Sequence, residues 1–178
     1  MNVTDRLAIL YVKAIRSFRL LTINVIQTLL FKRLAFKPNS ILINRDGAFG
    51  DSIVALPAID LVRQNYPETK IDLLNINNAG VNFSNLPIKQ GLIDELFSIT
   101  KKERKQTLGR LRNNNYDLFI QLPQNIGLYK SIRNMILVRF YLNIKHAIGW
   151  DAGRIKSFLA QQKNTYPCLL KVNVLYQH

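Results

Sequence analysis

The chain has 178 residues, 48% of them hydrophobic, which is enough to bury the core of one ordinary domain and excludes intrinsic disorder. A formal net charge of +14 indicates an anionic partner, but does not choose among a phosphorylated substrate, an acidic lipid surface and nucleic acid. The single cysteine, Cys168, excludes an intramolecular disulfide and a CxxC metal site. His146 and His178 lie far apart in the sequence, so we expect no bound metal.

Residues 1–37 are predicted to form a basic amphipathic helix ahead of a domain in residues 38–178. Apolar residues recur at three- and four-residue spacing and share one helix face: Leu7, Tyr11, Ala14, Phe18, Leu21, Val25 and Leu29. The opposite face carries Arg6, Lys13, Arg16, Ser17, Asn24 and Gln27. The longest uncharged stretch is shorter than the roughly 20 residues that span a bilayer. Two interpretations remain open: a helix packed on the domain behind it, or a helix lying on an anionic membrane surface.

From residue 38 onward, predicted strands and helices alternate along the chain. Strands are predicted in "ILIN", "YDLFIQL" and "KHAIGW", and a turn followed by a strand is predicted in "YPETKIDLL". For "IDELFSI" the pattern predicts either a short strand or a turn. Helices are predicted from Asp51 to about Tyr66, in "KKERKQTLGRLRNNN" and in "GLYKSIRNMILVRFYLN". This alternation predicts an α/β fold, in which helices cover the faces of a parallel sheet.

The first strand–turn–helix junction, "GAFGD", is the best candidate for a site. Gly47 and Gly50 allow a sharp turn and a close approach of the backbone to a ligand, and free N–H groups at the start of a helix favour an anion. The spacing matches neither GxGxxG nor the phosphate loop of nucleotide-binding proteins. Asp51 has two interpretations, a helix N-cap or a general base that takes a proton from a substrate hydroxyl, and spacing leaves both open.

Other conspicuous residues have structural interpretations beside functional ones. Lys130, Arg133 and Arg139 follow the "YDLFIQL" strand on one helix, either as solvated surface or as a basic wall for a phosphorylated acceptor. We expect His146 to be partly buried and Trp150 to pack in the core. The chain has no zinc finger, no RNP-like aromatic strand and no evident basic recognition helix, so we expect no nucleic-acid partner.

Several short motifs, taken in order, resemble the N-terminal domain of glycosyltransferase family 9, the ADP-heptose:lipopolysaccharide heptosyltransferases. They are "GAFGD", "LPAI", "NYPETKI", "YDLFIQLP" and "AIGW", and the resemblance covers roughly Ile41 to Asp151. It implies a GT-B architecture, in which two Rossmann-like domains enclose a cleft. This chain would be the N-terminal, acceptor-binding half, with the C-terminal donor domain absent. The implied reaction, in lipopolysaccharide or related glycan biosynthesis, inverts the anomeric centre and needs no metal or cofactor beyond a donor such as ADP-heptose.

The resemblance also implies residue roles, partners and a location. Asp51 would be the base, and substrate contacts would come from Gly47, Ala48, Phe49, Gly50, Ser52, Gln124, Asn125, Lys130 and Arg133. The implied partners are a phosphorylated glycolipid acceptor, an anionic membrane surface and a second chain carrying the donor domain. The location would be cytoplasmic, on the inner face of the cell membrane, and this chain alone would be inactive. Gln121 stands where family members often have an acidic residue. The alternative function is a non-catalytic membrane-surface module.

Overall fold

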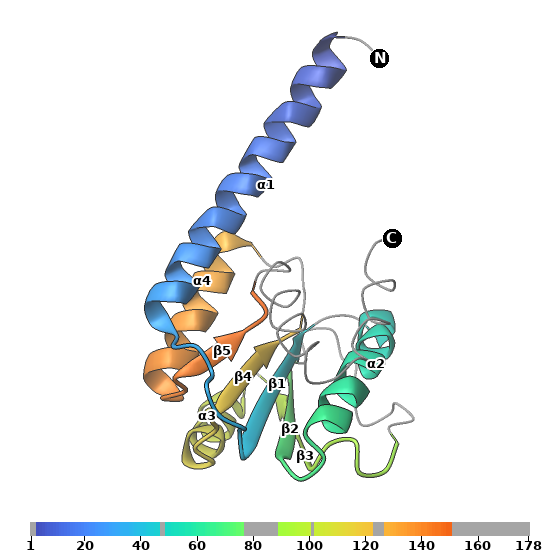
Figure 1. The fold of residues 1–178 in the computed structure, drawn as a ribbon, viewed down its shortest axis with the longest axis vertical. Coiled ribbons are helices and arrows are strands. Elements are labelled where there is room, and N and C mark those ends of the chain that lie inside the picture. Colours follow the sequence, from blue (N-terminus) through green and yellow to red (C-terminus); the bar gives the residue numbers. More distant parts are fainter. Residues whose placement is uncertain (1–2, 47–48, 77–88, 101, 123–126, 151–178) are drawn as a thin grey trace.

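The protein forms a five-stranded parallel sheet with helices on both faces (Figure 1). The computed structural model describes residues 3–46, 49–76, 89–100, 102–122 and 127–150. The strands are β1 (Ser40–Asp46), β2 (Lys70–Ile76), β3 (Glu95–Ile99), β4 (Leu118–Gln121) and β5 (His146–Ile148). The helices are α1 (Val3–Leu30), α2 (Phe49–Asn65), α3 (Arg104–Asn113) and α4 (Leu128–Ile136), which continues as the π-helical turn η2 (Leu137–Tyr141). The predicted α/β parallel sheet is confirmed, as are the strands and helices predicted within it.

Two hydrophobic cores lie on the two faces of the sheet. Successive side chains of a strand point to opposite faces, so Ile41 and Ile43 contribute to the core beneath α2, together with Ile59 of that helix. Leu42, between them, belongs to the other core, to which α1, α3 and α4 contribute and which includes Met135 of α4. The strands are therefore apolar on both faces, as expected for a buried parallel sheet.

Helix α1 packs on the domain only through its C-terminal half and extends beyond the sheet (Figure 1). Among the side chains of α1 that the structure describes, Ile23 and Gln27 are buried, 1% and 0% exposed, where the helix packs against α4. The predicted apolar face is the exposed one, because Gln27, predicted on the polar face, faces the domain. No helix of the described residues has a stretch long and apolar enough to cross a membrane.

A stack of three aromatic rings holds the end of α1 to the sheet. The indole of Trp150 lies between Phe31, just after α1, and Phe119 of β4, with ring centroids 5.4 and 5.3 Å apart and both interplanar angles 16°. On the same side, His146 Nδ1 lies 3.1 Å from the carbonyl oxygen of Lys32. The prediction that Trp150 packs in the core is confirmed, and so is the partly buried position of His146.

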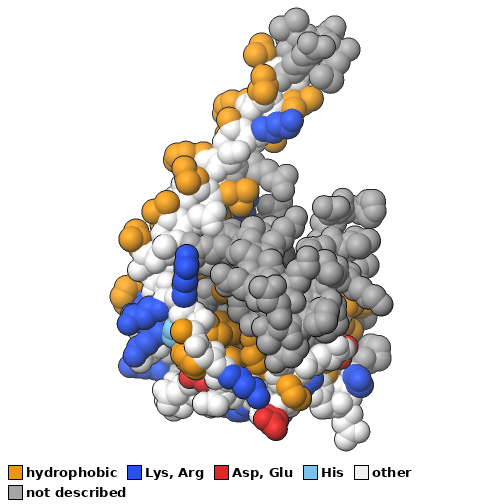
Figure 2. Space-filling model, in the orientation of Figure 1, with side chains coloured by type: hydrophobic (Ala, Val, Ile, Leu, Met, Phe, Trp, Pro, Cys, Tyr) orange, Lys and Arg blue, Asp and Glu red, His pale blue; other side chains and the backbone are white. Residues whose placement is uncertain are grey.

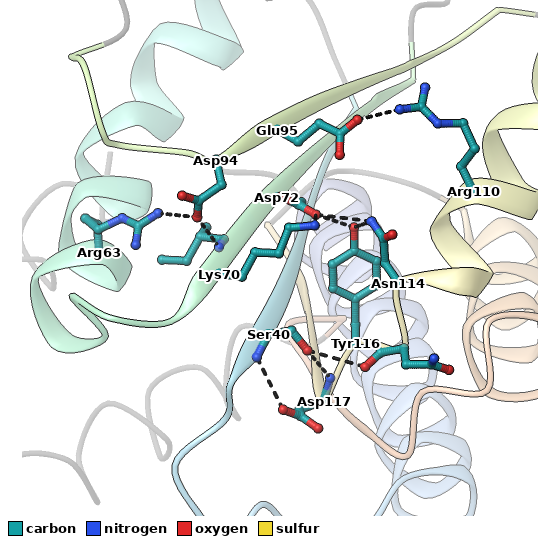
Figure 3. A network of polar contacts seen from close by, with 12 residues as sticks. Ser40, Arg63, Lys70, Asp72, Asp94, Glu95, Arg110, Asn114, Tyr116 and Asp117 are labelled. Carbon is teal, nitrogen blue, oxygen red and sulfur yellow. Dashed lines mark hydrogen bonds and ion pairs between the residues drawn. The ribbon is translucent and has the colours of Figure 1, made fainter.

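Polar contacts tie together the strands near their amino ends (Figure 3). The Tyr116 hydroxyl donates to the buried carboxylate of Asp72 at 2.5 Å. Burial raises the pKa of Tyr116 above its usual value, and the bond to Asp72 raises it further, so the phenol remains a donor. The carboxylate of Asp117 accepts hydrogen bonds from the backbone N–H groups of Asn39 (2.8 Å) and Ser40 (3.2 Å). The Tyr-Asp pair of the "YDL" motif is therefore structural and lies away from the carboxyl edge.

Asp94, in the same region of Figure 3, is expected to make stability depend on acid pH. One of its oxygens, Oδ2, accepts from the Ile71 N–H at 2.6 Å and from the Arg63 guanidinium at 2.7 Å. Burial alone would raise the pKa of Asp94, but these two partners outweigh burial and hold it below 3.8. The contribution of the ionised Asp94 carboxylate to stability is therefore complete above about pH 4, and it is lost as the pH falls through the folded-state pKa of Asp94.

Replacing Asp94 with asparagine is expected to lower the unfolding free energy at pH 7 by about 1 kcal/mol, since the carboxylate is half exposed and solvent screens the ion pair. Urea unfolding of both proteins between pH 2 and pH 7 measures the difference between them. The difference should shrink towards zero in acid. A difference that stays constant over that range would contradict the assigned role of the ionised carboxylate.

Candidate ligand site at the carboxyl edge of the sheet

The strand order β3-β2-β1-β4-β5 places a topological switch point between β1 and β4. From β1 the chain continues into α2 on one face of the sheet, and from β4 it continues into α4 on the other face. Ligands of open parallel sheets bind outside the carboxyl ends of the strands at such a point, because the two connections diverge and leave a crevice. This topology therefore predicts a ligand site at the switch point between β1 and β4.

Two groups of predicted site residues, about 80 positions apart in the sequence, lie on helices that flank the switch point. Phe49, Gly50, Asp51 and Ser52 form the first turn of α2, and Lys130 and Arg133 lie on α4 with exposed side chains. Since β1 and β4 are hydrogen-bonded neighbours, both helices start at the same edge of the sheet. Gly47, Ala48, Gln124 and Asn125 lie outside the described residues, as do the side chains of residues 49–52. The substrate contacts of these residues stay predictions.

The position of Asp51 bears on its two interpretations. Helix α2 begins at Phe49, so Asp51 lies within the first turn rather than ahead of it as an N-cap would. A carboxylate in the first turn is still stabilised by the free N–H groups and the helix dipole, which favour its ionised form. This position is compatible with a proton acceptor at the switch point, and the role of Asp51 as a base stays a prediction.

Sequence reasoning missed a set of buried polar side chains at the carboxyl ends of three adjacent strands. They are 1–6% exposed: Asn44, Arg45, Asn75 and Gln121. The available signal was the change from apolar to polar residues at the end of each strand, as in "ILINRD". Arg45 and Asn75 are neighbours in the register of β1 and β2, on the face covered by α2. Polar groups buried at this edge distinguish it from the apolar interior and mark it as the candidate site.

The Gln121 side chain links the neighbouring strands β1 and β4. Its Oε1 accepts from Asn44 Nδ2 at 2.8 Å, and its Nε2 donates to the carbonyl of Leu122 at 3.1 Å. An ionised acid at this position could accept but could not donate, whereas the amide serves both contacts. Gly149 packs against the same residue: a Cβ there would lie 2.0 Å from the Gln121 carbonyl oxygen, and its φ of +106° also requires glycine.

The electrostatics of this edge favour an anionic ligand. The first turns of α2 and α4 both point free N–H groups toward it, Arg45 adds a buried cation, and Lys130 adds an exposed one. Within the described residues, no three His, Cys, Asp or Glu side chains lie together as metal ligands do. The arrangement can therefore hold a phosphorylated or carboxylated compound beside a carboxylate in the first turn of α2.

Two solved structures are similar to part of this chain. One is the ADP-heptose lipopolysaccharide heptosyltransferase II of E. coli, with 24% sequence identity and a TM-score of 0.45; the match covers 62% of this chain and 30% of that one. The other is a glycosyltransferase of family 9 from Veillonella parvula DSM 2008, with 16% identity and a TM-score of 0.43, covering 62% and 31%. The matched region thus spans less than a third of either solved chain. No protein-family model and no curated protein matches the sequence.

Proposed function

We propose that this chain is the acceptor-binding half of a heptosyltransferase-like glycosyltransferase with a GT-B architecture. A donor-binding domain, carried by a second chain, would supply the nucleotide sugar. The observation that carries the proposal is the position of "GAFGD": the motif that resembles the family's catalytic loop leads from β1 into α2 at the switch point. The ordered motifs around it support the same family.

The proposed chemistry needs one carboxylate and a group of cations. A phosphorylated glycolipid acceptor binds with its phosphate near Lys130, Arg133 and the N–H groups that begin α2. Its hydroxyl oxygen attacks the anomeric carbon of the donor sugar, the hydroxyl proton passes to Asp51, and the nucleoside diphosphate leaves from the opposite face with the electrons of the broken C–O bond. The product is a glycoside of inverted configuration.

Acceptor binding is testable with a soluble probe, a doubly phosphorylated glucosamine disaccharide that represents the acceptor headgroup. NMR titration at 0.15 M salt should shift the amides at the carboxyl ends of β1 and β4. Lys130→Gln is expected to weaken binding about fivefold, since a cation–phosphate contact is worth on the order of 1 kcal/mol at an exposed site. Lys105→Gln on α3 is the matched control, with the same loss of charge on another exposed helix, and should change binding less than twofold.

Three results would contradict the proposal. Equal weakening by the two lysine variants would indicate binding by net charge alone. Amide shifts confined to the amino edge of the sheet would place the acceptor elsewhere. Glycosyl transfer from ADP-heptose by the pure 178-residue chain would remove the need for a donor-binding partner.

A further inference from the structure

The outward face of α1 is an apolar surface without a partner among the described residues. The three residues Phe18, Leu21 and Leu29 on this face are 67%, 63% and 79% exposed. The seven apolar positions from Leu7 to Leu29 follow three- and four-residue spacing, so they form one stripe along the helix. The helix packs on the domain through Ile23 and Gln27, which the same spacing places opposite the stripe. Because the packing face holds the helix in place, the stripe remains directed away from the domain.

A basic cavity of about 560 Å³ lies at the C-terminal end of this stripe. Its lining includes three cations, Lys32, Arg33 and Arg139, beside the apolar side chains of Leu29 and Phe140. The Arg139 guanidinium lies 5.9 Å from the centre of the Phe140 ring, and that ring is 68% exposed. Figure 2 shows the hydrophobic side chains along α1 and the Lys and Arg side chains gathered near its lower end. Since Leu29 belongs to both, stripe and cavity form one continuous surface.

We propose that this surface docks on an anionic lipid bilayer, with the stripe of α1 in the interface and lipid phosphate groups in the cavity of Lys32, Arg33 and Arg139. An interfacial helix buries its apolar face at the boundary of headgroups and acyl chains, and adjacent cations bind anionic headgroups. Exposed aromatic rings such as Phe140 are suited to the same boundary. The inference does not depend on the proposed transferase function, because none of these residues belongs to the switch point.

Charge favours a bilayer over a second copy of this chain. A second copy carries the same cations and the same net charge of +14, so docking two copies through this surface would oppose chains of like charge. Among the described residues, those that line the cavity include no acid, and Asp5 is the only acid in the sequence of α1, in its first turn. An acidic bilayer, in contrast, presents negative charge to every cation of this docking surface, which a second copy cannot do.

The experiment is sedimentation of the full chain with unilamellar vesicles of phosphatidylcholine alone or with 30% phosphatidylglycerol added. We expect binding to the anionic vesicles that is at least tenfold tighter than to neutral ones. The double variant Phe18→Ser/Leu21→Ser should lose at least about tenfold in affinity, because two large apolar side chains no longer enter the interface. Lys32→Gln/Arg33→Gln should lose about fivefold for each cation on anionic vesicles and little on neutral ones.

Matched controls test whether vesicle binding depends on this surface or on the charge and hydrophobicity of the whole chain. Val54→Ser removes an apolar side chain of similar exposure, 58%, from α2, and Lys102→Gln/Lys105→Gln removes two exposed cations near and on α3. Both should bind as the wild type does, and circular dichroism should show that all variants remain folded. Unchanged binding by Phe18→Ser/Leu21→Ser would overturn the proposal. An equal loss of vesicle binding in the control variants would also overturn it. A third contradicting result is a chain that does not bind vesicles but forms a dimer in analytical ultracentrifugation, if Phe18→Ser/Leu21→Ser abolishes that dimer.

Discussion

Replacing Asp51 with asparagine is expected to slow glycosyl transfer by about 10²–10⁴-fold, the usual contribution of a general base. The assay contains this chain, a second chain with the donor domain, ADP-heptose and the phosphorylated glycolipid acceptor. Acceptor binding should change less than about threefold, because asparagine keeps the size of the side chain and the surrounding cations remain. The loss should therefore appear in kcat rather than in KM.

Two comparisons make the Asp51 result specific. Asp60→Asn on the same helix removes an equivalent carboxylate, whose partner is Gln64 one turn away, and should leave transfer unchanged. Asparagine in the first turn loses only the charge–dipole contribution, typically below about 1 kcal/mol, so a purely structural Asp51 predicts transfer near the wild-type rate. That outcome would mean that Asp51 only stabilises the start of α2, and the proposed reaction would then have no base.

Replacing Trp150 with alanine is expected to lower the unfolding free energy by about 3–5 kcal/mol. The indole is 8% exposed, and it is stacked between a ring that follows α1 and a ring of β4, so its removal leaves a cavity and frees the end of α1. Urea unfolding must be followed by circular dichroism, since this is the only tryptophan of the chain. Hydrogen exchange should also accelerate in the last two turns of α1.

Trp150→Phe is the matched control for the aromatic stack. Phenylalanine keeps an aromatic ring between Phe31 and Phe119, and it removes an indole N–H that is buried without a hydrogen-bond partner among the described residues. We expect a loss below about 1.5 kcal/mol for this variant. Similar losses in the alanine and phenylalanine variants would mean that the stack does not hold α1.

Local pattern was sufficient to predict the elements and the fold class. Apolar runs bounded by turn residues predicted the strands, and alternation with helical patterns predicted a parallel sheet, because parallel strands need crossover helices. The same pattern located "GAFGD" between a strand and a helix. The buried amide pair of Asn44 and Gln121 was not predictable, because these residues are 77 positions apart and only strand pairing makes them neighbours. That α4, which carries Lys130, starts at the same edge of the sheet as α2 depends on strand order in the same way.

The continuous apolar face of α1 is predictable from local spacing, since helical periodicity needs no information on distant residues. The direction in which that face points depends on packing between segments that are far apart in the chain. Burial of Ile23 and Gln27 against α4, together with the ring stack of Trp150, orients the helix with its apolar stripe outward. For the motifs "YDL" and "AIGW" too, the sequence and the structure provide different information. Their order in the sequence is the basis of a resemblance, whereas their hydrogen bonds and ring contacts assign Tyr116 and Trp150 to stability, because those contacts join segments far apart in the chain.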